Sequence, residues 1–89
     1  MFDLYIFKNL DTQLYGIEFF IEDEPESEYD EFEDLRGMAI ALKYFRNGFN
    51  LEQDRIFNAK PNRSDSQVQE NEIIPLTTEE TGELERFLS

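Results

Sequence analysis

The pattern of apolar and polar positions is clearest at the start of the chain. In residues 2–9, large apolar side chains recur with a period of two, which is typical of a half-buried strand. Residues 9–12 are of turn-forming types, and residues 14–21 return to strand composition. The first part of the chain therefore predicts a β-hairpin, and Gly16 in its second strand is typical of a bulge.

Further along, the apolar spacing changes from two to three and four. This spacing puts the apolar side chains on one stripe of an amphipathic helix. We place the helix at about residues 28–47, with Ser27 as its start signal. The stripe consists of Phe32, Leu35, Met38, Ala39, Leu42 and Phe45.

The middle of the chain has weaker signals. Residues 49–57 fit either a short strand, with 55–57 as its core, or a helical turn at 50–53. Residues 60–66 have the composition of a loop. These two assignments leave room for a further strand between the main helix and the C-terminal part of the chain.

The C-terminal part predicts a strand and a short helix. Residues 67–76 have moderate strand character, and Pro75 indicates the end or edge of that strand. Residues 77–80 match the capping-box pattern that opens helices. We therefore expect one α+β domain over residues 1–89, with helices on one face of a small, mainly antiparallel sheet.

Charge is distributed unevenly along this pattern. The chain has 21 acidic residues, 8 basic residues and no His, which gives a net charge of −13. Residues 1–34 carry −11 of this charge, residues 35–63 carry +4, and residues 64–89 carry −6. Nine of the thirteen residues from 22 to 34 are acidic and none is basic. We call residues 22–34 the acidic run.

The side-chain types that are missing limit the possible chemistry. Without Cys or His the chain has no thiolate nucleophile, no zinc site of the usual kind and no Ser-His-Asp arrangement. The four glycines are too far apart for a phosphate-binding loop. We expect no cofactor, no metal and no catalysis. An enzyme using Asp, Glu and Tyr is disfavoured because the acids cluster in one run.

A cation site is the remaining chemical alternative for the acidic run, because carboxylate-rich loops bind Ca²⁺. The run lacks the glycine and the ligand spacing of an EF-hand, so only a weak, irregular site would fit it. A solvated loop leading into a favourable helix start is the simplest structural explanation of the same residues.

The charge and the start of the chain also limit partners and location. A net charge of −13 opposes contact with free nucleic acid or with anionic membranes. The sequence has no basic leader followed by a long apolar stretch, so we expect a cytoplasmic protein. Its thirteen aromatic residues leave room for a protein interface, with a partner or with a second copy of the chain.

The density of charge in the acidic run suggests a function. Thirteen residues span about 20 Å as a helix or about 43 Å as a strand, so one carboxylate falls every ~2.2 or ~4.8 Å. Duplex DNA carries one charge per roughly 1.7 Å of axis. We therefore expect a non-catalytic inhibitor that binds a basic, nucleic-acid-binding surface of another protein. The predicted contact residues are Glu22, Asp23, Glu24, Glu26, Glu28, Tyr29, Asp30, Glu31, Phe32, Glu33 and Asp34.

In size and charge, this chain resembles the acidic anti-defence proteins of phages and mobile elements, including anti-restriction and anti-CRISPR inhibitors. The alternative is an immunity protein or antitoxin that neutralises one basic toxin or nuclease. Both alternatives use the same carboxylates, because both rely on electrostatic complementarity to a basic surface.

Overall fold

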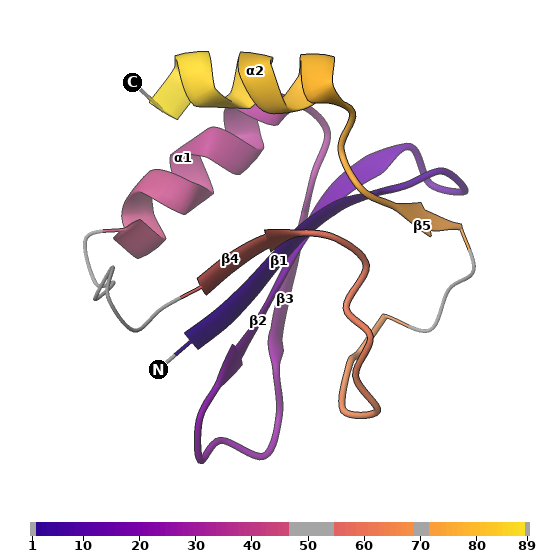
Figure 1. The fold of residues 1–89 in the computed structure, drawn as a ribbon, viewed down its shortest axis with the longest axis vertical. Coiled ribbons are helices and arrows are strands. Elements are labelled where there is room, and N and C mark those ends of the chain that lie inside the picture. The colour runs from indigo at the N-terminus through magenta and orange to yellow at the C-terminus, as the bar shows by residue number, and fades with distance from the viewer. Residues whose placement is uncertain (1, 47–54, 69–71, 89) are drawn as a thin grey trace.

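The computed structural model describes residues 2–46, 55–68 and 72–88 (Figure 1). The order of elements is two strands of a hairpin, a third strand, a helix, two short strands and a final helix. Their bounds are β1 Phe2–Asn9, β2 Leu14–Ile21, β3 Glu28–Phe32, α1 Leu35–Arg46, β4 Arg55–Asn58, β5 Ile73–Ile74 and α2 Thr78–Leu88. The chain is thus an α+β fold, as the sequence predicts.

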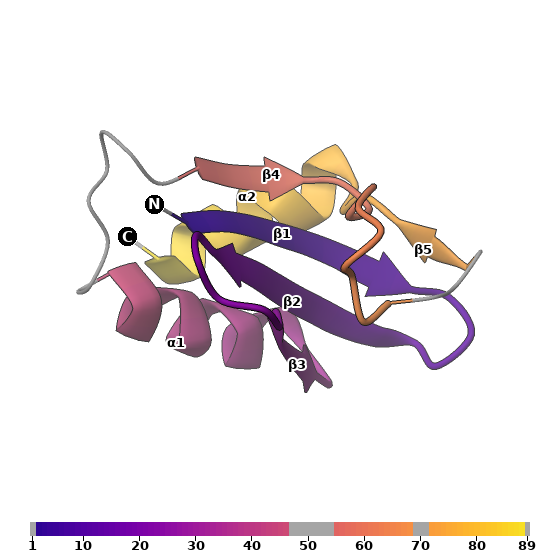
Figure 2. The ribbon, with the colours of Figure 1, turned by 90° about the horizontal axis from the view of Figure 1, so that it is seen from below.

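The strands form one mixed sheet in the order β3-β2-β1-β4, which Figure 2 shows with β3 and β4 at its two outer edges. β1 pairs antiparallel with β2, and β2 pairs antiparallel with β3. β4 runs parallel to the first part of β1, while β5 pairs antiparallel with its last two residues. Antiparallel pairing therefore dominates, as expected, with one parallel pair at the edge.

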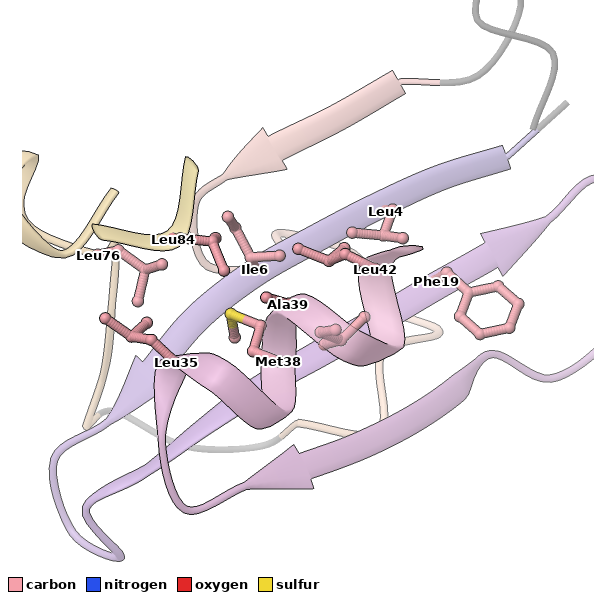
Figure 3. Packing of buried hydrophobic residues seen from close by; sticks show 10 residues of the cluster. Leu4, Ile6, Phe19, Leu35, Met38, Ala39, Leu42, Leu76 and Leu84 are labelled. Carbon is pink, nitrogen blue, oxygen red and sulfur yellow. The ribbon is translucent and has the colours of Figure 1, made fainter. Parts of the chain in front are cut away.

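One face of the sheet packs against the helices. Every second residue of β1 and β2 points to this face (Figure 3). The helix side of the core comes mainly from four residues of the predicted stripe, Leu35, Met38, Ala39 and Leu42, whereas Phe32, the first residue of that stripe, lies in β3. The side chain of Phe45, the last residue of that stripe, lies outside the described residues. The buried cluster consists of Leu4, Ile6, Ile17, Phe19, Leu35, Met38, Ala39, Leu42, Leu76 and Leu84.

The predicted start of the main helix is wrong. Residues 28–32 form strand β3, and the helix begins only at Leu35. Asp34 caps this helix, because its Oδ1 accepts a hydrogen bond of 2.8 Å from the backbone N–H of Gly37. The expected cap Ser27 is instead buried and bonded to β2. The described part of the helix ends at Arg46, and Asn47 lies outside the described residues.

The C-terminal predictions hold in part. Helix α2 opens with the expected capping box: the N–H of Glu80 donates to Thr77 Oγ1, and the N–H of Thr77 donates to Glu80 Oε1. The sequence allows either a strand or a helical turn in residues 49–57. Residues 55–58 form a strand, and the alternative helical turn at 50–53 lies outside the described residues. Within the stretch expected to be a strand, 67–76, residues 69–71 lie outside the described part, and the described residues contain the strand Ile73–Ile74, which ends directly before Pro75.

The opposite face of the sheet, which we call the second face, is lined with aromatic rings. Tyr5 packs against Phe20 edge to face and against Phe57 in a stacked arrangement, and Phe7 stacks with Tyr29. Residues 59–68 run over this face and are called the covering loop. The guanidinium of Arg63 in this loop lies 4.1 Å from the ring centroid of Phe20.

Gly16 is required by this second face and does not form the expected bulge. The pairing of β1 with β2 continues without interruption through Phe7 and Gly16. A Cβ atom on Gly16 would clash with the ring of Phe7, which is fully buried. Glycine at this position therefore makes space for the ring that packs across the strand pair.

Replacing Gly16 with alanine should lower the free energy of unfolding by about 1–3 kcal/mol, because the ring of Phe7 must move out of a close-packed site. Urea denaturation of both proteins measures the change. Gly82→Ala is the matched control, since a Cβ there would meet no atom within 4 Å, and it should stabilise helix α2 by up to ~1 kcal/mol. Equal stability of Gly16→Ala and the parent protein would contradict the close packing.

Candidate protein-binding surface

The acidic run begins with a tight turn at the end of β2. The backbone N–H of Glu24 donates to the carbonyl of Ile21 at 3.1 Å, which closes the turn. Asp23 has a φ of 75°, a left-handed conformation that Asp adopts more readily than most residues. The chain therefore reverses direction here, and Glu22, Asp23, Glu24 and Glu26 are all exposed at the tip of the β2–β3 hairpin.

The rest of the run follows the edge of the sheet. β3 pairs with β2 on one side only, and it ends the strand order at this edge. Along β3, Glu28 and Asp30 lie on the helix side of the sheet, and Glu31 lies on the other side. Together with Glu33 and Asp34, all nine acidic residues of the run are exposed.

The two aromatic residues of the run point inward. Tyr29 is half-buried and stacks on Phe7, with ring centroids 6.2 Å apart. Burial, followed by the charge of Glu31 and a hydrogen bond to it, raises the pKa of Tyr29 to about 12. Phe32 is half-buried and packs against the helix-side core. Both rings help to hold the edge strand in place, and their expected role as partner contacts stays a prediction.

The acids of the run have no cationic partner in the described part of the chain. The ion pairs found there join Lys8 to Glu80, and Arg63 to Asp3 and Asp65. Arg36, the first cation after the run, lies 5.4 Å from the ring centroid of Phe87. The negative charge of the run is therefore not neutralised from within these parts of the molecule. An uncompensated group of like charges of this kind creates a negative potential over the surrounding surface.

A buried carboxylate beneath the run was not predicted from the sequence. Glu18 in the middle of β2 is fully buried on the second face. It accepts hydrogen bonds from the hydroxyl of Ser27 at 2.6 Å, from the hydroxyl of Ser66 at 2.5 Å and from the backbone N–H of Gln67 at 2.7 Å. The period of two places Glu18 on this face, but no local signal identifies its three donors.

Glu18 therefore joins three segments of the chain. Ser27 stands directly before β3, so its bond to Glu18 fixes where the edge strand begins. Ser66 and Gln67 belong to the covering loop, and the side-chain amide of Gln67 also donates to the carbonyl of Ser27. A buried carboxylate is stable only when its lone pairs are satisfied, and here three donors satisfy them.

A second polar cluster connects the hairpin to helix α2. The hydroxyl of Tyr15 donates to Glu80 Oε2 at 2.7 Å, and Lys8 Nζ lies 3.7 Å from the same oxygen. Burial and this hydrogen bond raise the pKa of Tyr15 to about 12. Burial alone would raise the pKa of Glu80, but the N–H of Thr77, the Tyr15 hydroxyl and Lys8 outweigh it and lower that pKa. The cluster therefore holds helix α2 against the β1–β2 hairpin.

Two kinds of site are not found in the described residues. Within residues 2–46, 55–68 and 72–88, no group of three or more Asp or Glu side chains is placed to hold a metal ion. Neither of the two described helices is long and apolar enough to cross a membrane. Comparison with protein-family models, with curated proteins and with solved structures found no match.

The lowered pKa of Glu80 predicts how Glu80→Gln changes the dependence of stability on pH. The carboxylate is stabilised in the folded protein, so its contribution is complete above the ordinary pKa of a glutamate. At pH 7 the variant should be less stable by about 1 kcal/mol. This difference should vanish as the pH falls through the lowered pKa. Urea denaturation between pH 7 and pH 3 measures it.

The exposed neighbour Glu79 supplies the control, because Glu79→Gln removes a charge from the same helical turn without removing the cap. A stability difference for Glu80→Gln that stays constant down to pH 3 would show that the carboxylate is not the group that matters.

Proposed function

We propose that this protein is a non-catalytic acidic inhibitor that acts in the cytoplasm by binding a basic, nucleic-acid-binding surface of a partner protein. One observation carries the proposal: nine carboxylates lie exposed along one hairpin tip and one sheet edge, with no cation paired to them in the described residues. The size and charge of the chain are those of anti-defence inhibitors from phages and mobile elements.

The geometry supports a long contact rather than a single pocket. In strand β3 the carboxylates of Glu28 and Asp30 are about 6.8 Å apart on the helix side of the sheet, and that of Glu31 lies on the other side. A single DNA strand carries one phosphate per 3.4 Å of axis. A groove that binds a nucleic-acid backbone would therefore meet charges along this edge whose spacing is within about a factor of two of that of the phosphates. Such complementarity mainly increases the association rate and selects the partner.

Protection of an exposed edge is the simplest competing explanation. Charged residues on edge strands prevent pairing with other sheets, and Glu28, Asp30 and Glu31 serve that purpose in any case. That need does not extend to the hairpin tip, which has no strand edge to protect. Glu22, Asp23, Glu24 and Glu26 at the tip nevertheless carry four further charges. The charge at the tip supports a role in binding.

The test begins with capture of partners from a host lysate at low salt, followed by elution with a salt gradient. We expect the captured protein to be basic, to bind nucleic acid by itself and to be displaced by duplex DNA or RNA. Its affinity should fall steeply with salt, because long-range attraction is screened. Binding that is equally tight at low and high salt, or a partner that binds no nucleic acid, would contradict the proposal.

Charge-reversal variants then test which surface of the protein binds the partner. Replacing Glu26, Glu28, Asp30 and Glu31 with lysine should weaken binding by about tenfold or more. Asp34 is left unchanged because it caps helix α1. The matched control reverses four exposed acids elsewhere and alters the net charge equally; we expect it to weaken binding by less than about threefold. Its positions are Asp11, Asp65, Glu72 and Glu79.

Equal losses of binding for the two variants would show that total charge, and not the acidic run, determines binding.

The identity of the captured protein also separates the proposal from its alternative. A cognate toxin as partner would mean that the chain is an immunity protein that uses the same surface.

A further inference from the structure

An apolar groove lies on the helix side of the sheet, at the edge opposite the acidic run. Its volume is about 330 Å³, and it lies between β4 and the two helices. Ile56 of β4 is 45% exposed beside it, which is unusual for a large aliphatic side chain facing the core side of a sheet. The apolar lining is Ile6, Leu42, Ile56, Leu84 and Leu88, of which Figure 3 labels Ile6, Leu42 and Leu84.

A second hollow continues this groove along helix α2. It has a volume of about 300 Å³, and it shares Asn58, Thr81 and Glu85 with the first. Its lining is more polar than that of the first hollow, and Glu85 is the charged side chain within it. The second hollow, which we call the acidic end, and the mainly apolar first hollow share the carboxylate of Glu85 and together make one elongated groove. We call it the β4–α2 groove.

Gly82 keeps the acidic end of the groove open. A glycine inside a helix costs about 1 kcal/mol relative to alanine. The fold does not require it here, because a Cβ on Gly82 would meet no atom within 4 Å. Gly82 lines the polar hollow, so the missing side chain leaves space in the groove at a cost to the helix.

The backbone of β4 offers hydrogen bonds along the same groove. The N–H of Ala59 donates to the carbonyl of Ile6, so the odd-numbered residues of β4 face β1. The N–H and carbonyl of Ile56 therefore point away from β1. In the described residues no strand pairs with this outer side. An extended segment can bind such an edge through its own backbone.

We propose that the β4–α2 groove binds an extended segment of another protein that carries a large aliphatic residue and, two positions later, Lys or Arg. Residues two apart on a strand point to the same side at a distance of about 6.8 Å, so an extended segment can place both side chains in the groove at once. Glu85 selects the cation at the acidic end. A second copy is disfavoured because it brings another charge of −13.

Three short capped peptides test the proposal by two-dimensional NMR of the whole protein. They are Thr-Ile-Thr-Lys-Thr, Thr-Ile-Thr-Glu-Thr and Thr-Ser-Thr-Lys-Thr. The first should give saturable shifts at Ile56, Gly82, Leu84 and Leu88. Exchange of Lys for Glu should weaken binding by about threefold to fivefold. Exchange of Ile for Ser should weaken it by about tenfold.

Gly82→Met is the decisive variant, because it fills the acidic end and favours the helix at the same time. The midpoint of thermal unfolding should rise by about 3–6 °C, while peptide affinity falls by about fivefold or more. Loss of binding therefore cannot be ascribed to misfolding. Ile56→Thr should also weaken binding. Ile40→Thr, at an aliphatic position of α1 that is 65% exposed, should leave it unchanged.

Three results would overturn the proposal: no peptide shifts at the groove, shifts confined to residues 22–34, or concentration-dependent shifts at Ile56 with a dimeric mass. The last would mean that a second copy covers the groove. The inference does not depend on the proposed inhibitor function. The lysine variant at Glu26, Glu28, Asp30 and Glu31 should bind the first peptide as the parent protein does.

Discussion

The structure depends on one buried carboxylate. Glu18 lies in the middle of the sheet with no exposure to solvent, and such a group is tolerated only where donors surround it. Two of its donors come from the covering loop and one from Ser27, which precedes the edge strand. The same interaction therefore closes the second face of the sheet and sets the position of β3. Loss of one donor would leave a charge buried with too few partners, so the three bonds support one another.

The two contacts that we propose lie at opposite edges of one sheet. The helix side holds an aliphatic core, and the second side holds stacked aromatic rings beneath the covering loop. Both faces are occupied, so the two edges of the sheet are the places that remain for partners. One edge, with the hairpin tip, carries exposed acids. The other carries Ile56 and an apolar groove. The long electrostatic contact and the short apolar contact that we propose would thus be kept apart on the molecule.

Local sequence patterns correctly predicted those elements in which the structural preference of the residues matches the packing that they make in the fold. The first hairpin, the buried stripe of α1 and the capping box of α2 are of this kind. Glu28, Asp30 and Glu31 are poor strand formers, but pairing with β2 and the burial of Tyr29 and Phe32 outweigh that preference. Ser27 was misread as a helix cap because its partner, Glu18, is nine residues away. The exposed acids could be located from sequence; the groove could not, because it is built from distant segments.

Amide hydrogen exchange at Gln67 tests most directly whether the carboxylate of Glu18 organises the fold. This amide belongs to a loop, yet it donates to Glu18 at 2.7 Å. We expect its exchange to be slowed nearly as much as that of the central strands, and to become fast in Glu18→Gln while α2 stays protected. Exchange of the Gln67 amide in the parent protein at the rate of an unstructured peptide would contradict the account.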